Sequence, residues 1–213
     1  MDGNRPVITI GRQFGSGGRE LGRMLAERLG YDFYDKELLF EAARQSGMNP
    51  ELFKQSDERF PRFLGGITFA MGLNPYSLFC GPSTVGDDSV NRAIADCITA
   101  LGNRGGCVIV GRTADYVLRD NPNCFNIFVH APLEKRIERI LARGDAKTMA
   151  EAKVLAERTN KLRANYYNFY TDKTWGDAST YHLSVDSSVA PMERIVDMII
   201  PLLGIDQSQS TSL

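Results

Sequence analysis

Short apolar runs alternate along the chain with longer segments whose apolar residues recur at helical spacing. The β-branched run 7–10 is followed by a glycine-rich turn, and then by leucine and methionine residues at helical spacing from Leu21 to Leu29. The apolar run 107–110 has no polar alternation, which is typical of a strand buried on both faces. This order of strand, glycine turn and helix predicts a parallel sheet rather than a series of hairpins.

The same alternation continues to the end of the chain. Further strands are predicted over 31–35, 125–130 and 181–185, and helices over 20–29, 36–45, 89–101, 113–118, from 132 onward and 191–203. Strands that alternate with helices in this way favour an α/β fold, with a five-stranded parallel sheet and helices on both faces.

Two stretches depart from this alternation. Residues 49–88 contain four prolines and many phenylalanines and glycines without a sustained period, which indicates an insertion or cover. Residues 206–213 offer nothing apolar to bury, so we expect a disordered tail after one domain that spans 1–205.

Composition narrows the class of protein. The chain has 213 residues, 43% of them hydrophobic, which suffices for one globular domain with a real core. Its 25 basic and 26 acidic side chains provide no overall positive field for duplex nucleic acid or for an acidic membrane surface. No long apolar run suggests secretion or a membrane span, and the four separated cysteines suggest reduced thiols, so we expect a cytoplasmic protein.

The clearest candidate for chemistry is the glycine-rich loop 11–19, GRQFGSGGR, between the first strand and the first helix. Successive backbone amides and a helix N-terminus can converge on a phosphate in such a loop. A plain turn is the alternative, but four glycines in eight residues exceed what a turn needs. We therefore expect phosphate binding by a group of loop residues: Arg12, Gly15, Ser16, Gly17, Gly18 and Arg19.

The loop differs from the usual pattern G-x-x-x-x-G-K-[ST]. If Gly17 is its second glycine, Gly18 stands at the lysine position, Arg19 at the hydroxyl position and Arg12 at the first glycine. The charge of the lysine must then come from elsewhere, with Arg19 and Arg12 as the nearest candidates. The magnesium-binding hydroxyl is either Ser16 or absent.

Five stretches of the chain resemble the cytidylate kinase-like family, a divergent relative of the CMP kinases. They are ITIGRQFGSGGRELG, YDFYDKELL, CVIVGRTADYVL, IFVHAPLEKRIERI and RTNKLRANYYNFYTDKTWGD. The resemblance implies a P-loop NTPase-type three-layer sandwich. It divides the domain into a core (5–48, 89–143 and 176–205), an acceptor-binding insertion (about 49–88) and an arginine-bearing lid (about 143–175).

The resemblance also implies roles for residues at the ends of strands. Asp35 ends the second strand, where the family has an aspartate near the sugar of the acceptor, although a helix N-cap explains it equally well. Arg112 matches the arginine of a Gly-Arg-Asp motif and is expected to grip the acceptor phosphate or base. The aspartate of that motif is Thr113 here, so Asp115 is a candidate to compensate, unless it is an ordinary solvated helix residue.

Arginines after the fourth strand form one helical stripe at 136, 139 and 143. A solvated face with salt bridges to Glu134 and Glu138 is one reading of this stripe. The family places lid arginines here to neutralise charge on the transferring phosphoryl group, which implies catalytic roles for Arg139, Arg143, Arg158 and Arg163. The aromatic run from Tyr166 to Tyr170 is predicted to pack rather than to stack on a base.

The resemblance therefore implies a phosphotransferase that uses ATP and Mg²⁺ and phosphorylates a nucleoside monophosphate such as CMP or dCMP. Nucleotides would be its partners, and a monomer and a homodimer are both open. Two alternatives remain: a non-catalytic nucleotide-binding regulatory module, and a P-loop kinase for another small acceptor, whose pocket the segment 50–88 would form.

Overall fold

The computed structural model describes residues 5–39 and 85–205, the side chains of 85–90 excepted. Five strands form one sheet in the order β2-β3-β1-β4-β5, and every neighbouring pair is parallel. The strands are β1 (Val7–Arg12), β2 (Asp32–Tyr34), β3 (Cys107–Val110), β4 (Cys124–His130) and β5 (Leu183–Asp186). The predicted five-stranded parallel sheet is confirmed.

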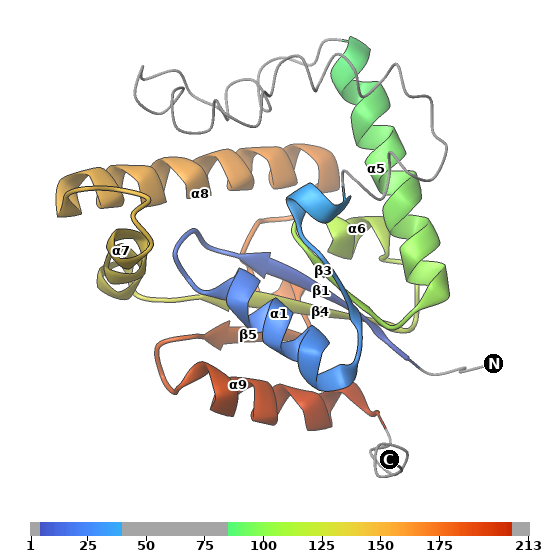
Figure 1. Ribbon diagram of the computed structural model, residues 1–213. Helices are drawn as coiled ribbons and strands as arrows, with labels where there is room; N and C mark the ends of the chain where they lie inside the picture. The colour runs from blue at the N-terminus through green and yellow to red at the C-terminus, as the bar shows by residue number, and fades with distance from the viewer. Residues whose placement is uncertain (1–4, 40–84, 206–213) are drawn as a thin grey trace.

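Helices cover both faces of this sheet (Figure 1). They are α1 (Gly18–Leu29), α5 (Val85–Arg104), α6 (Ala114–Val117), α7 (Leu133–Ala142), α8 (Met149–Thr171) and α9 (Met192–Ile199), with short 3-10 turns η1 (Ala178–Thr180) and η2 (Ile200–Leu203). Residues 36–39 are also helical. In Figure 1 α9 lies on the opposite side of the sheet from α5 and α6, which gives the predicted three layers.

The alternation of side chains along the strands separates two cores. Ile8 and Ile10 of β1 pack with Val108 of β3 against α1 and α9. Val7 and Ile109 point to the other face and pack against α5 and α6. Strand β3 is buried along its whole length, as its continuous apolar run predicts.

Element boundaries differ from the predictions in physically understandable ways. Helix α5 extends over 85–104, so residues 85–88 belong to a helix although they were predicted to end the insertion. The last helix changes to a 3-10 turn at Ile200, where Pro201 lacks the amide hydrogen that an α-helix requires. The rest of the predicted insertion and the tail 206–213 lie outside the described residues, and the proposed domain divisions stay predictions.

The predicted lid region contains one long helix. Helix α8 runs from Met149 to Thr171 and begins with a capping box, in which Thr148 and Glu151 bond each other's backbone amides. Buried alanines of α8 pack against Ile137 and Ile140 of α7. In the part of the chain that the structure describes, no helix is long and apolar enough to cross a membrane.

Strand β4, which lies between β1 and β5, gives a test of this packing. Replacing the fully buried Ile127 by alanine should lower the free energy of unfolding by about 2–5 kcal/mol, because a cavity adds to the lost burial. Urea unfolding followed by circular dichroism measures the change. Val189→Ala, at a position 72% exposed, is the matched control and should stay within about 0.5 kcal/mol of the unaltered protein. Equal effects of the two substitutions would contradict the assigned core.

Candidate active site

Two glycines shape the loop between β1 and α1. Gly15 and Gly17 have φ angles of 81° and 80°, a region that favours glycine. A Cβ atom at position 15 would also lie 2.8 Å from the carbonyl oxygen of Arg136. Gly17 is the N-cap of α1 and supplies no side-chain hydrogen bond to the first turn. The helix N-terminus is therefore capped by no side chain at this position, which suits it to an external anion.

The carbonyl oxygen of Ser16 fixes the loop to two distant elements. It accepts hydrogen bonds from Arg139 Nη1 on α7 (3.0 Å) and from Ser187 Oγ just after β5 (2.5 Å). Arg139 Nη2 also donates to the Ser187 carbonyl at 2.8 Å. Arg139 thus holds the loop in place through these hydrogen bonds, and the catalytic role implied for it stays a prediction.

The neighbouring arginine of the predicted stripe differs from expectation. Arg136 is only 8% exposed, and its Nε atom donates to the Ala131 carbonyl at 3.0 Å. Burial lowers the pKa of its guanidinium. A solvated face is therefore wrong for Arg136, because the helix turns this position toward α8 and the loop.

The hydroxyl of Ser16 lies inside the loop. Ser16 has no exposed surface, and its Oγ donates to the Gln13 carbonyl at 2.9 Å. The hydroxyl of Ser16 is therefore buried and already has a partner within the loop, which argues against the metal-binding role predicted for it. Within the described residues, no group of three or more histidine, cysteine or acidic side chains could hold a metal ion.

A basic cavity of about 620 Å³ opens over the loop, and we call it the loop cavity. Its cations are Arg12, Arg19, Arg23, Arg139, Arg143 and Arg163, and its acids are Glu20 and Asp145. The excess of positive charge is local, since the chain as a whole has a formal charge of −1. Such a concentration of guanidinium groups beside backbone amides favours a polyanionic ligand.

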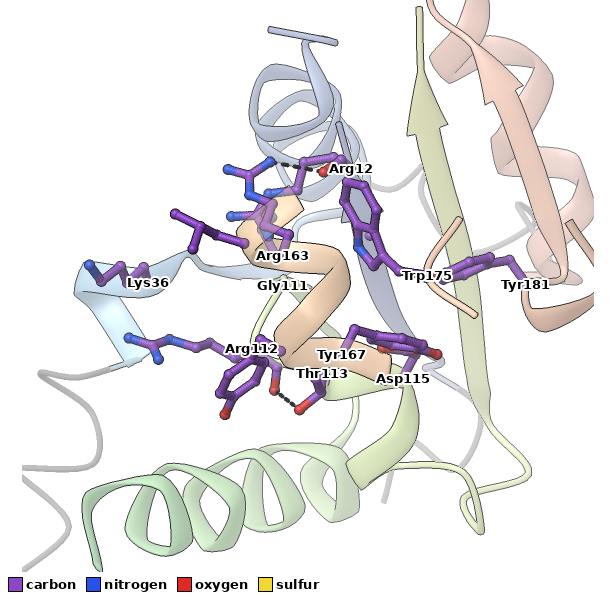
Figure 2. Close-up of a pocket in the computed structure, with 14 residues that line it drawn as sticks. Arg12, Lys36, Gly111, Arg112, Thr113, Asp115, Arg163, Tyr167, Trp175 and Tyr181 are labelled. Carbon is purple, nitrogen blue, oxygen red and sulfur yellow. Dashed lines mark hydrogen bonds between the residues drawn. The ribbon is translucent and has the colours of Figure 1, made fainter. Parts of the chain in front are cut away.

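The ring of Phe14 organises two of these arginines. The guanidinium carbons of Arg143 and Arg163 lie 5.5 and 5.7 Å from its centroid, within the range of cation–π attraction. Arg163 Nη1 also donates to the Arg12 carbonyl at 2.9 Å, as the dashed line in Figure 2 shows. The structure therefore brings Arg143 and Arg163 to the loop. Arg158 is exposed on α8. It lines neither the loop cavity nor the cavity at the carboxyl ends of β1 and β3.

The second cavity lies at the carboxyl ends of β1 and β3, and we call it the strand-end pocket (Figure 2). Its cations are Arg12, Lys36, Arg112 and Arg163, and its aromatic side chains are Tyr166, Tyr167, Trp175 and Tyr181. The carboxyl edge of an open parallel sheet is where ligands bind in α/β proteins. Arg112 thus lies where its position after β3 predicts.

The backbone that places Arg112 is unusual. Gly111, Arg112 and Thr113 have φ angles of 82°, 59° and 51°, so three consecutive residues are left-handed. Each of the two that are not glycine costs on the order of 1 kcal/mol or more. Strain of this kind persists where the surrounding structure holds it, and here it turns the Arg112 side chain into the strand-end pocket.

Asp115 forms the polar end of the strand-end pocket. Its carboxylate accepts a hydrogen bond of 2.6 Å from the hydroxyl of Tyr167, which is 3% exposed. Burial raises the pKa of Asp115, and the Tyr167 hydrogen bond opposes part of that rise. The alternative reading of Asp115 as an ordinary solvated helix residue does not fit, because Tyr167 of α8 bonds to its carboxylate. In Figure 2, Asp115 and Tyr181 lie on the side of the pocket away from Lys36 and Arg112.

Arg19 and Asp35 form an ion pair. Arg19 donates from Nε and Nη2 to Asp35 Oδ2 at 2.8 and 2.5 Å, and Asp35 Oδ1 accepts the Leu38 amide at 3.2 Å. The helix-cap reading of Asp35 is therefore supported. Asp35 is 4% exposed and lines neither the loop cavity nor the strand-end pocket, which argues against the predicted contact with an acceptor sugar.

Several residues of the site were missed from the sequence, among them Lys36, Tyr181 and Ser187. Lys36 and Tyr181 line the strand-end pocket, and Ser187 supports the loop. Lys36 and Ser187 closely follow β2 and β5, so the sequence pattern already placed them at the carboxyl edge of the sheet, where ligands bind in α/β proteins. Tyr181 precedes β5, and the pattern gave no such placement for it.

The ion pair predicts a pH-dependent contribution to stability. Burial alone would raise the pKa of Asp35, but hydrogen bonds from Arg19 and the Leu38 amide outweigh it and lower the pKa. An aspartate with a lowered pKa stabilises the fold above the unfolded value of about 3.9, and that contribution is lost as the pH falls through the folded value.

Asp35→Asn should therefore lower the free energy of unfolding at pH 7 by about 1 kcal/mol, a modest value because Arg19 is exposed. Asparagine keeps an acceptor for the helix cap. Chemical unfolding at pH 7 and pH 3 measures the effect, which should shrink at the lower pH. The same loss at both values would mean that the ion pair is not its source.

Comparison with known proteins places these features in a family. A model of the cytidylate kinase-like family matches residues 7–189. A cytidylate kinase of Pyrococcus furiosus is 29% identical over 184 residues, which cover 85% of this chain and 80% of that protein. A cytidylate kinase of Methanocaldococcus jannaschii is 24% identical over 197 residues, covering 91% and 94%.

Solved structures agree on the fold. An uncharacterized protein from Eubacterium ventriosum is 25% identical, with a TM-score of 0.69 over 95% of this chain and 100% of that one. A gluconokinase from Sinorhizobium meliloti has a TM-score of 0.52 at 18% identity, over 94% and 92% of the two chains, and shares the P-loop kinase fold. Because the family model covers most of the chain, the protein belongs to the cytidylate kinase-like family.

Proposed function

We propose that the protein is a nucleoside monophosphate kinase, which transfers the γ-phosphoryl group of ATP to CMP or dCMP. One observation carries this proposal: the loop cavity and the strand-end pocket share Arg12 and Arg163. A phosphoryl group that passes between two nucleotides needs two adjoining sites with cations at their border. The choice of CMP or dCMP rests on the cytidylate kinases among the relatives.

The loop cavity is the proposed site of ATP. Backbone amides of residues 15–19 would bind its β-phosphate, since the left-handed glycines open the loop and the N-terminus of α1 follows directly. Arg143 and Arg163, held against Phe14, would contact the outer phosphates. Holding these cations in place before ATP binds lowers the cost of ordering them during the reaction.

The strand-end pocket is the proposed site of the acceptor. Its charges are arranged unevenly, with Arg112 and Lys36 on one side and the Asp115 and Tyr167 pair on the other. The cations suit the acceptor phosphate, and the end formed by Asp115 and Tyr167 suits the hydrogen-bonding edge of a base. This assignment keeps Arg112 and Asp115 as acceptor residues and leaves Asp35 outside the contact surface.

Mg²⁺ is implied by the family, and the described side chains would act on it through the bound nucleotide rather than as its ligands. Ser16 is buried and no ligand cluster occurs among the residues described, so Mg²⁺ would enter on ATP, held by phosphate oxygens and water. When bound, it would neutralise phosphate charge. The protein's own contribution is to hold the nucleotides and to supply the remaining positive charge.

The transfer itself requires little from the protein beyond placement. The bond from the γ-phosphorus to the bridging oxygen breaks, and a bond to an oxygen of the acceptor phosphate forms. That acceptor oxygen carries no proton near neutral pH, so a general base is unnecessary. Arg12 and Arg163 lie at the border of the two cavities, where charge on the moving phosphoryl group would develop.

Phosphotransfer with a panel of acceptors tests the proposal. ATP, Mg²⁺ and CMP, dCMP, UMP or AMP are incubated with the protein, and ADP formation should be fastest with CMP or dCMP. Arg112→Ala should lower kcat/KM by about 10²-fold or more, because a charged contact to the acceptor is lost. Arg28→Ala is the matched control, since Arg28 pairs with Asp197 away from both cavities. ATP binding without turnover on any monophosphate would instead favour a regulatory module or another acceptor.

The Asp115 and Tyr167 pair gives a second, more selective test. Tyr167→Phe removes the hydroxyl that holds the Asp115 carboxylate, so it should raise KM for the monophosphate several-fold and change KM for ATP little. Tyr170→Phe, on the exposed part of α8 outside both cavities, is the control. Steady-state kinetics with each substrate varied in turn measures both constants. Equal changes in the two constants would show that the pair does not face the acceptor.

A further inference from the structure

Two positions of the loop exchange residue types relative to the usual phosphate-binding pattern. That pattern has glycine at its first position and lysine directly after its last glycine. In this chain the first position is Arg12, and the position after Gly17 is Gly18. The loop 11–19 therefore contains no lysine, yet it has gained an arginine where the pattern has none.

The structure shows that these two changes depend on each other. Arg12 is the last residue of β1, and its side chain passes directly over Gly18. A Cβ atom at position 18 would lie 2.6 Å from Cβ and 3.2 Å from Cγ of Arg12, and 3.3 Å from Cβ of Val129. Any side chain at position 18, lysine included, would collide with Arg12. Arg12 can therefore take this conformation only because position 18 is a glycine.

A second glycine makes room for the other end of the same side chain. The guanidinium of Arg12 lies against the Cα atom of Gly111, and a Cβ atom there would collide with its Nη1. Gly111 also has a φ of 82°, which favours glycine. Arg12 therefore follows a path that two glycines from different segments leave open.

This path ends at the border of the two cavities. Arg12 lines both the loop cavity and the strand-end pocket, and its carbonyl accepts the hydrogen bond from Arg163. Arg19, the other nearby arginine, lines the loop cavity alone and gives its Nε and Nη2 hydrogen bonds to Asp35. Of the two arginines, only Arg12 reaches both proposed nucleotide sites.

We propose that Arg12 is a catalytic residue that replaces the lysine of the phosphate-binding loop, with Gly18 as its steric complement. The positive charge has moved from the start of α1 to the end of β1. From there a guanidinium can contact oxygens of both the donor and the acceptor, which a planar group with five donors does well. The inference rests on the proposed function for the identity of the two nucleotides.

Reversing the exchange tests this inference. The variants are Arg12→Gly, Gly18→Lys, and the double variant that restores the usual pattern. Either single change should lower kcat by about 10²-fold or more, the first through loss of charge and the second through the collision. The double variant should recover much of the loss, because lysine then has the space that Arg12 vacates. Its melting temperature should likewise exceed that of Gly18→Lys.

Binding of ATP gives a readout that does not depend on turnover. Displacement of a fluorescent ATP analogue should show weaker ATP binding for Arg12→Gly and for Arg12→Lys, which keeps the charge but loses the planar fork. Arg19→Gln should weaken binding less, and Arg28→Gln should leave it unchanged. If the unaltered protein binds ATP but phosphorylates no monophosphate, the proposed function fails, and these affinities still decide the role of Arg12.

Two results would overturn the inference. One is an Arg12→Gly protein that keeps its ATP affinity and turnover while Arg19→Gln loses both, which would assign the charge to Arg19. The other is a double variant whose effects are additive. Its loss in log kcat would then equal the sum of the losses in log kcat of the two single variants, and its drop in melting temperature would equal the sum of their drops. Such additivity would mean that positions 12 and 18 are independent.

Discussion

The carbonyl oxygen of Ser16 is the point on which the active site depends. It receives hydrogen bonds from α7, through Arg139, and from the segment after β5, through Ser187. A glycine-rich loop pays a large entropic cost to adopt one conformation, since glycine loses more freedom than other residues. Charged and neutral donors on one carbonyl offset part of that cost. Because the loop lines the loop cavity and carries Arg12 at its start, its conformation also sets the border of the strand-end pocket.

The electrostatics of the site follow from which arginines have acidic partners. Asp35 takes two donors of Arg19, and Asp145 pairs with Arg143 at 2.7 Å. These pairs hold long side chains at fixed positions and leave further donors of each guanidinium directed elsewhere. Asp115 bonds instead to a tyrosine and lies in a setting that raises its pKa. Positive charge thus concentrates over the loop, although the chain as a whole is close to neutral.

The sequence predicted the features that depend on local pattern. Strand β3 was found because an uninterrupted apolar run has few alternatives, and Arg112 was placed because it directly follows that strand. The features that were missed join distant segments. Tyr167 reaches Asp115 across 52 residues, and Ser187 reaches Ser16 across 171. The sequence pattern gives each element its place, but it does not say which side chains meet where helices cross the sheet.

The arrangement of cations bears on whether the chain is a kinase or a binding module. A module that only senses a nucleotide needs charge around one site. Here Arg12 and Arg163 lie between two cavities, and a hydrogen bond joins them. Under the proposed function, the transferring phosphoryl group would bring negative charge to the border of the cavities. Two cations that line both cavities therefore favour phosphotransfer over the binding of a single ligand.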